Sequence, residues 1–178
     1  FTNQKTNKFL LLIFCFSIFS SISQSNEDIP FNNMAINETS KPISSIIFHD
    51  FSGNKINLDD YKGNLIILNF WATWCAPCKK EMPSLDKLQT NPELDNIKIF
   101  AINIGKENLD KVNKFFVDLN IKNLEPYFDP PTTLAKMFSL RGVPTTILIN
   151  KEGQEFARVI GSINFEDKNF VNWIKKYN

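Results

Sequence analysis

Two cysteines three residues apart, Cys75 and Cys78, constrain this chain more than any other feature, because they stand where a predicted strand meets a predicted helix. The apolar run LIILNFW at 65–71 predicts a buried central strand. Residues 75–89 predict a helix, with Pro77 in the first turn, where its missing N–H is no loss. The fold must therefore hold a cysteine pair at a strand-to-helix junction.

The spacing of the pair allows three kinds of site: half of a zinc site, a structural disulfide, or a redox-active pair that cycles between dithiol and disulfide. A structural zinc site takes four Cys or His ligands, and beyond the pair the chain offers only Cys15 and His49. A disulfide between Cys75 and Cys78 would close a very short loop, so it would restrict the unfolded chain little. Redox cycling is the favoured interpretation, and the other two remain as alternatives.

The predicted position of Cys75 at a helix N-terminus suits redox chemistry. The unpaired N–H groups and the helix macrodipole stabilise a thiolate there. Cys78, one turn further along, would be shielded and positioned to attack a mixed disulfide on Cys75. Trp71 and Trp74 would wall the site and keep it apolar, although Trp71 suits an ordinary core position equally well.

The rest of the chain alternates between strand and helix signals. A turn at Ser52-Gly53-Asn54 predicts a β-hairpin within 46–64. Apolar residues at 109, 112, 115, 116 and 119 predict an amphipathic helix over 107–120, and Thr132 is expected to cap a helix that ends near Leu140. Further strands are predicted at 97–105, 124–128, 145–150 and 155–161, and a closing helix at 165–177. This order predicts an α/β fold with a central mixed β-sheet flanked by helices on both faces.

The first residues differ in kind from the rest. Lys5 and Lys8 precede the apolar run of residues 9–19, and the small-x-small triplet Ser21-Ile22-Ser23 follows it. This pattern is typical of a secretory signal peptide, and the run is shorter than the ~20 residues that a membrane-spanning helix needs. We expect residues 1–23 to be a signal peptide or a membrane anchor, with Cys15 as a passenger in it.

Two further segments complete the predicted organisation. Residues 24–46 are polar and contain Pro30 and Pro42, so we expect a polar tether there, followed by a single domain over 47–178. Hydrophobic residues make up 43% of the chain, which is ample for a core without a stabilising metal. The formal net charge is +1 and no basic stripe with interleaved aromatics occurs, which argues against nucleic-acid binding.

The segment NFWATWCAPCKKEMPSLDKL at 69–88 resembles the active-site segment of thioredoxin-like proteins, and within them the TlpA/ResA-like thiol-disulfide oxidoreductases. The resemblance covers about 47–178. It includes Leu58 and the run Tyr61-Lys62-Gly63-Asn64 before the central strand, an added segment at about 103–141, and the element GVPTTILIN at 142–150. It implies a thioredoxin-like fold with an N-terminal β-hairpin and a family-type insertion.

The resemblance also assigns site residues. It implies a redox-active Cys75–Cys78 disulfide and a cis peptide bond at Val143-Pro144 that packs beside it; cis X-Pro bonds are uncommon. Pro144 thereby joins the catalytic residues, and the backbone of Val143 is expected to offer main-chain hydrogen bonds to an extended client segment. The substrate-binding surface is expected to comprise Trp74, Ala76, Pro77 and Val143.

Asn69 and Glu81 depart from the pattern of ordinary thioredoxins. Those proteins have a buried Asp at the position of Asn69, and an asparagine cannot accept a proton from Cys78. Glu81 stands one helical turn after Cys78 and matches the acidic residue of ResA-like and cytochrome-maturation thioredoxins. As a catalytic residue it would favour the dithiol and pass protons. The alternative is an exposed helix glutamate beside Lys79 and Lys80.

These expectations describe an exported thiol-disulfide oxidoreductase that reduces client proteins through Cys75 and Cys78 and needs no bound cofactor or metal. Its expected partners are proteins with disulfides or thiols, such as apocytochrome c or a copper-site protein, and a membrane electron donor. We expect a periplasmic or extracytoplasmic monomer, with residues 9–22 as the candidate anchor. The alternatives are a disulfide-forming oxidant with the same site and a non-catalytic binding module. A peroxidase of the peroxiredoxin kind would need a lone cysteine in a Thr-x-x-Cys setting, and the local sequence Thr73-Trp74-Cys75 lacks it.

Overall fold

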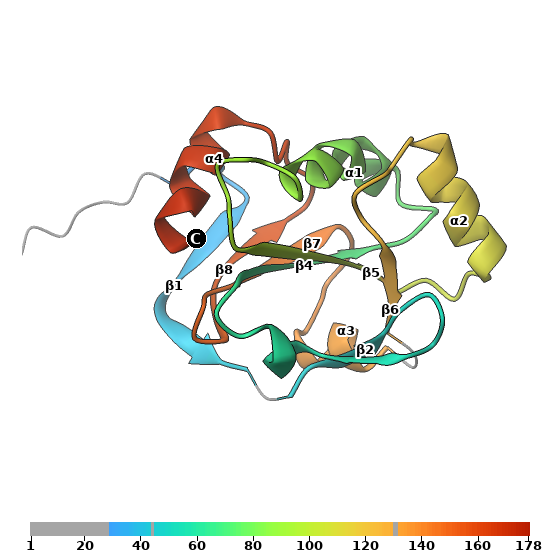
Figure 1. Ribbon diagram of the computed structural model, residues 1–178, viewed down its shortest axis with the longest axis horizontal. Helices are drawn as coiled ribbons and strands as arrows, with labels where there is room; N and C mark the ends of the chain where they lie inside the picture. The colour runs from blue at the N-terminus through green and yellow to red at the C-terminus, as the bar shows by residue number, and fades with distance from the viewer. Residues whose placement is uncertain (1–28, 44, 130–131) are drawn as a thin grey trace, which may run out of the picture.

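A single mixed β-sheet organises the computed structural model, which describes residues 29–43, 45–129 and 132–178 (Figure 1). Within these residues the sheet has eight strands in the order β1-β8-β7-β4-β5-β6-β2-β3. The strands are β1 (Met34–Pro42), β2 (Ile47–His49), β3 (Lys55–Asn57), β4 (Leu65–Trp71), β5 (Ile97–Asn103), β6 (Pro126–Phe128), β7 (Thr145–Ile149) and β8 (Gln154–Ile160). β4 pairs in parallel with β5 and antiparallel with β7, so it lies in the middle of the sheet, as its sequence predicts.

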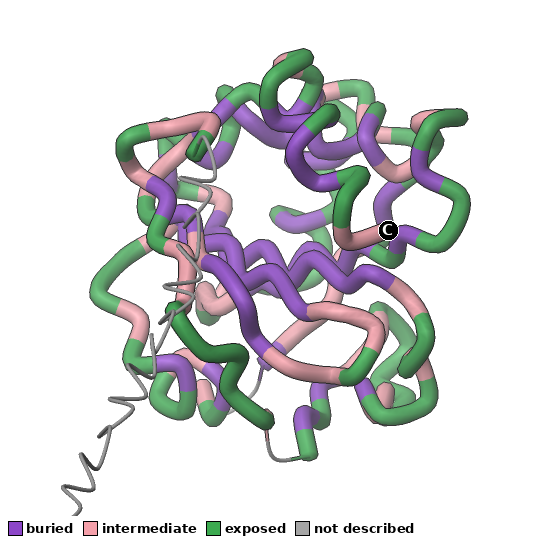
Figure 2. The backbone as a smooth tube through the Cα atoms, turned by 90° about the vertical axis from the view of Figure 1, so that its left-hand side faces the viewer, coloured by how far each residue is buried: buried purple, intermediate pink, exposed green. Residues whose placement is uncertain are grey.

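Helices cover both faces of the sheet, which confirms the predicted fold class. The helices are α1 (Ala76–Leu88), α2 (Leu109–Asp118), α3 (Thr133–Met137) and α4 (Lys168–Ile174), with short 3-10 turns at Leu58–Tyr61 and Lys175–Tyr177. Figure 1 shows α1, α2 and α4 above the sheet and α3 below it. The central strands are buried between these two layers (Figure 2).

The side chains of β4 alternate between the two layers, and this alternation positions the later site. All seven residues of β4 are buried. Leu65, Ile67 and Trp71 pack in the core beneath α1, α2 and α4, whereas Ile66, Leu68 and Phe70 pack in the core beside α3. Because side chains alternate across a strand, Asn69 points to the α1 side of the sheet.

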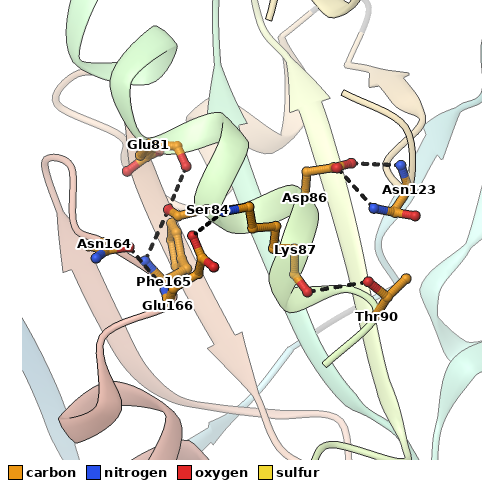
Figure 3. A network of polar contacts seen from close by, with 9 residues as sticks. All are labelled: Glu81, Ser84, Asp86, Lys87, Thr90, Asn123, Asn164, Phe165 and Glu166. Atoms are coloured by element: carbon orange, nitrogen blue, oxygen red, sulfur yellow. Dashed lines mark hydrogen bonds and ion pairs between the residues drawn. The ribbon is translucent and has the colours of Figure 1, made fainter. Parts of the chain in front are cut away.

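A buried carboxylate fastens α1 to the chain that enters β6. Asp86 Oδ1 accepts hydrogen bonds from the backbone N–H groups of Lys122 (3.1 Å), Asn123 (2.7 Å) and Leu124 (2.9 Å). Asp86 Oδ2 accepts a fourth from Asn123 Nδ2 at 2.9 Å (Figure 3). The Asp86 side chain thus accepts the hydrogen bonds of three successive backbone N–H groups in the turn that links α2 to β6.

Replacing Asp86 with alanine is expected to lower the free energy of unfolding by about 2 kcal/mol, because the backbone donors of that turn lose a charged acceptor. Urea unfolding of the disulfide form, followed by circular dichroism, measures the change. Asp95 is exposed and serves as the matched control; Asp95→Ala should stay within about 0.5 kcal/mol of the wild type. Equal losses in the two variants would contradict the anchoring role of Asp86.

The expected tether is wrong for part of its length. Residues 34–42 form β1, which pairs antiparallel with β8 and extends the edge of the sheet. The pattern of burial explains the error: Met34 is buried, but most of the strand is exposed, so its sequence is polar like that of a linker. The sheet therefore begins before residue 47. The predicted export segment, 1–23, lies outside the described residues.

Two predicted helix starts differ in outcome. Thr132 is the N-cap residue of α3 as predicted, but its side chain makes no capping hydrogen bond to the helix; Asp129 Oδ2 instead accepts from the backbone N–H of Ala135 at 3.0 Å. α4 begins three residues later than predicted, because Asp167 caps it by accepting from the N–H of Asn169 at 2.8 Å. In α2, Val112, Phe115 and Phe116 are buried as predicted, whereas Leu109 is 46% exposed.

Candidate active site

The cysteine pair lies at the junction of β4 and α1, as predicted. Cys75 is the N-cap residue of α1, and its Sγ accepts a hydrogen bond from the backbone N–H of Cys78 at 3.1 Å. Cys75 and Cys78 form a disulfide. The structure therefore describes the oxidised state of the pair, with Cys75 Sγ held at a helix N-terminus, where a thiolate would be stabilised.

The two sulfur-bearing residues differ in accessibility. Cys75 is 4% exposed, whereas Cys78 is fully buried. Trp74 beside them is 70% exposed, and Ala76 and Pro77 are exposed as well. An approaching molecule would therefore meet Trp74, Ala76 and Pro77 on the surface and reach Cys75 first.

The predicted cis peptide bond between Val143 and Pro144 is confirmed. The carbonyl oxygen of Val143 lies 3.5 Å from Cys75 Sγ. In the disulfide Sγ carries no hydrogen, so this is a contact; in the dithiol the thiol can donate to the carbonyl. Pro144 is buried, and its carbonyl accepts from the N–H of Gly161 at 2.9 Å, which ties the loop to the end of β8.

Glu81 is 1% exposed, which excludes the exposed-glutamate alternative. Its Oε1 accepts from Asn69 Nδ2 at 2.9 Å, and its Oε2 accepts from the backbone N–H of Ile163 at 3.3 Å. Asn69 Nδ2 also donates to Thr146 Oγ1 at 3.0 Å. Figure 3 shows Glu81 above Ser84, whose hydroxyl donates to the Glu81 carbonyl at 2.7 Å. The carboxyl group thus lies between α1, the sheet and the loop before α4.

Burial raises the pKa of Glu81 from 4.5 to about 7, against the opposing effect of the hydrogen bonds from Asn69 and Ile163. A carboxyl group with this pKa exchanges protons near neutral pH, which is the property a general acid or base needs. Asn69, which is fully buried, cannot titrate and acts only as a hydrogen-bonding partner.

A second glutamate holds the loop before Cys75, and sequence reasoning missed it. Glu107 Oε1 accepts from the backbone N–H of Thr73 at 3.0 Å and from its hydroxyl at 2.9 Å. Glu107 is 34 residues away along the chain. The pairing of β4 with β5, which sets Trp71 opposite Asn103, brings the two loops together. No local sequence signal marks this contact.

His49 lies on β2 opposite Phe128 of β6. Among the described residues, no group of three or more His, Cys, Asp or Glu is arranged to hold a metal ion. Within the same residues, no helix combines the length and the apolar character needed to cross a membrane. The predicted anchor at 9–22 falls outside the described ranges.

The described sheet and helices, with a cysteine pair at the start of α1 and a cis-proline beside it, define a thioredoxin-like thiol-disulfide oxidoreductase. The AhpC/TSA family model matches residues 38–154. The thiol-disulfide oxidoreductase ResA of Bacillus subtilis (strain 168) is 29% identical over 157 residues, which cover 86% of this chain and 82% of that protein. ResA of a Bacillus cereus strain is 32% identical over 121 residues, which cover 68% of this chain and 69% of that protein.

A solved structure agrees with these relatives. The crystal structure of StoA from Bacillus subtilis has a TM-score of 0.62 and 26% identity, and the match covers 73% of this chain and 96% of that one. The chain belongs to the AhpC/TSA family, and it is a ResA-like protein-disulfide oxidoreductase.

Proposed function

We propose that this protein is an exported reductant of client disulfides, acting through Cys75 as the attacking residue and Cys78 as the resolving residue. The observation that carries the proposal is the difference in accessibility: Cys75 keeps 4% of its surface exposed, whereas Cys78 has none. Cys75 is therefore the sulfur that a disulfide in another protein meets first. The N-terminus of α1 and the backbone N–H of Cys78 would stabilise a thiolate on Cys75.

The proposed cycle transfers two electrons to the client. The Cys75 thiolate attacks one sulfur of the client disulfide; the client S–S bond breaks, and a mixed disulfide with Cys75 forms. The Cys78 thiolate then attacks Cys75 Sγ, forms the Cys75–Cys78 disulfide and releases the second client sulfur. A dithiol donor at the membrane returns the electrons and regenerates the pair. The cycle requires no bound cofactor.

Glu81 is proposed to accept the proton of Cys78 when the mixed disulfide is resolved. The two residues lie one helical turn apart on α1, and both are buried. With a pKa of about 7, the carboxylate is present in part at neutral pH and can take up a proton. A negative charge beside the pair also disfavours a second one on sulfur, so it favours neutral thiols over thiolates in the reduced pair. Because this withholds stabilisation from the reduced pair, it suits a reductant.

The client is proposed to bind along the exposed surface around Cys75. Trp74, Ala76 and Pro77 offer an apolar face there, and the Val143 carbonyl beside Cys75 is available to an extended segment. The resemblance to reductive family members suggests apocytochrome c or a copper-site protein as the client. The export pattern within residues 1–23 supports a location outside the cytoplasm.

The direction of electron flow has its own test. We expect the pair to equilibrate near the reducing end of the known range, about −270 mV, and far from the oxidising end at about −120 mV. Alkylation of Cys75 and Cys78 after incubation in glutathione or dithiothreitol redox buffers measures the reduced fraction. A midpoint near the oxidising end would overturn the proposed reductant and indicate a disulfide-forming oxidant.

A further inference from the structure

A pocket of about 600 Å³ opens at the carboxyl end of β5, beside the loop that carries Cys75. Three segments far apart in the sequence supply most of its lining: residues 49–53 from the end of β2 onward, residues 103–107 from the end of β5 onward, and residues 128–129 at the end of β6. Leu109 and Thr132 complete the described lining. Its volume lies within the range of small-molecule sites in proteins. None of the roles proposed above uses this pocket.

One carboxylate connects the pocket to the active site. Glu107 lines the pocket, and its Oε1 accepts both hydrogen bonds from Thr73, two residues before Cys75. The N–H of Ile104, also in the pocket wall, donates to the carbonyl of Trp71 at 3.0 Å. A molecule in the pocket would therefore lie next to the segment that presents Cys75 to its client.

Buried polar atoms in the pocket lining lack partners. Asn103 is 2% exposed, yet neither its Nδ2 nor its Oδ1 makes a hydrogen bond among the described residues. Glu107 Oε2 and His49 Nδ1 are likewise buried without a partner in that part of the chain. Buried polar groups in native proteins are almost always paired, so each of these atoms needs an explanation. A ligand with complementary groups supplies one.

Most of the unpaired atoms favour a ligand that donates hydrogen bonds. Asn103 Nδ2 is a donor, but Asn103 Oδ1 and Glu107 Oε2 are acceptors, and His49 Nδ1 is an acceptor in one tautomer. The charges agree with this preference, because among the described residues Asp50, Glu107 and Asp129 line the pocket against one cation, Lys106. The lining thus carries a net negative charge and an excess of acceptors, which suits a cation.

The entrance of the pocket is apolar. Phe51 is 42% exposed and Leu109 is 46% exposed, and both line the pocket. Phe51 also packs against Phe128, with ring centroids 6.3 Å apart. An aliphatic stem can lie against Leu109, and a planar cation can stack on an aromatic ring such as that of Phe51. A guanidinium group combines five donors, a fixed positive charge and a flat face.

We infer that this pocket binds a basic side chain of the client, arginine being the best match, while a nearby client disulfide reaches Cys75. The inference rests on the proposed function, because it names a feature of the client that the same site recognises. The pocket selects clients by charge, and the cysteine pair performs the exchange.

Binding can be tested apart from electron transfer. The oxidised protein is titrated with N-acetyl-arginine amide, with its neutral isostere N-acetyl-citrulline amide, and with N-acetyl-norleucine amide, and backbone NMR shifts of residues 49–53 and 103–107 are followed. Arginine is expected to bind at least about tenfold more tightly than citrulline, since charged partners strengthen hydrogen bonds. Equal affinities, or shifts outside these segments, would overturn the inference.

Glu107→Gln sharpens the test, because glutamine keeps an oxygen for Thr73 and replaces the acceptor at Oε2 with a donor. We expect it to reduce the preference for arginine over citrulline by about tenfold. Glu152 is exposed, and Glu152→Gln is the matched control that should leave the preference unchanged. Phe51→Ala, at the exposed entrance, gives a second variant should Glu107→Gln fail to fold; it should weaken arginine binding about threefold. An unchanged preference in Glu107→Gln, or unchanged arginine binding in Phe51→Ala, would contradict the assignment.

Turnover separates this inference from the proposed function. The reduced protein is given disulfide peptides with arginine or citrulline two to five residues from the cysteine, and a small uncharged disulfide. We expect a lower KM for an arginine peptide at unchanged kcat. Equal kcat/KM for both peptides would refute the pocket's role and leave the reductase intact. No reduction of any disulfide, with arginine binding retained, would refute the proposed reductase instead.

Discussion

Replacing Cys75 with serine is expected to abolish reduction of protein disulfides, with a loss of about a thousandfold or more. A serine hydroxyl is not ionised at neutral pH and cannot attack a disulfide as a thiolate does. Cys78 cannot substitute for it, because Cys78 is fully buried and a folded client cannot reach its sulfur. Steady-state reduction of a fluorescent disulfide peptide, with dithiothreitol as electron donor, measures the loss.

The variants at the other cysteines make this prediction specific. Cys78→Ser is expected to slow turnover strongly, because only dithiothreitol can then resolve the mixed disulfide. It should retain the first attack in a single-turnover experiment, since Cys75 still meets the client. Cys15 has no assigned role, so Cys15→Ser is the matched control and should reduce the peptide at the wild-type rate. Substantial turnover by Cys75→Ser would contradict the assignment of Cys75 as the attacking residue.

Glu81 is expected to make the stability of the protein depend on pH in an unusual direction for a glutamate. Its pKa is 4.5 in the unfolded reference and about 7 in the folded protein. Between these values the folded state binds more protons, so the free energy of unfolding falls as the pH rises. Each pKa unit is worth about 1.4 kcal/mol, which gives about 3 kcal/mol lost between pH 4.5 and pH 8.

Comparison with Glu81→Gln isolates this effect from all other titrating groups. Glutamine cannot ionise, so the difference in unfolding free energy between wild type and Glu81→Gln should change by about 3 kcal/mol over that interval. Urea unfolding at several pH values, with the disulfide intact so that the cysteines do not titrate, gives the curves. The curve of unfolding free energy against pH for the control Glu152→Gln should run parallel to that of the wild type. Parallel curves for Glu81→Gln as well would mean that Glu81 titrates normally.

The sequence predicts the centre of this fold better than its edge. β4 is a continuous apolar run because it is buried on both faces, and such a run is recognisable without a structure. β1 is an edge strand that is exposed along most of its length, so it has the composition of a linker, and only its pairing with β8 makes it a strand. Leu109 likewise fits the helical pattern of α2, yet it lies at the entrance of a pocket.

Part of the candidate site could likewise be predicted from the sequence, and part could not. The cysteine pair, Val143-Pro144 and Glu81 stand in motifs that a single sequence displays; the cis bond is confirmed, and the exposed alternative for Glu81 is excluded. The pocket beside the site is different. Glu107 and Asn103 come to line it only because β4 pairs with β5 and the chain after β2 lies beside them. Contacts between distant segments leave no local pattern to detect.

The most direct test of the account is to trap the mixed disulfide with a client. Cys78→Ser, reduced and then mixed with a disulfide-containing client protein, should accumulate a covalent adduct that mass spectrometry of proteolytic fragments assigns to Cys75. Cys75→Ser treated in the same way should form no adduct on Cys78. An adduct on Cys78 in the second variant, or none in the first, would contradict the proposed cycle.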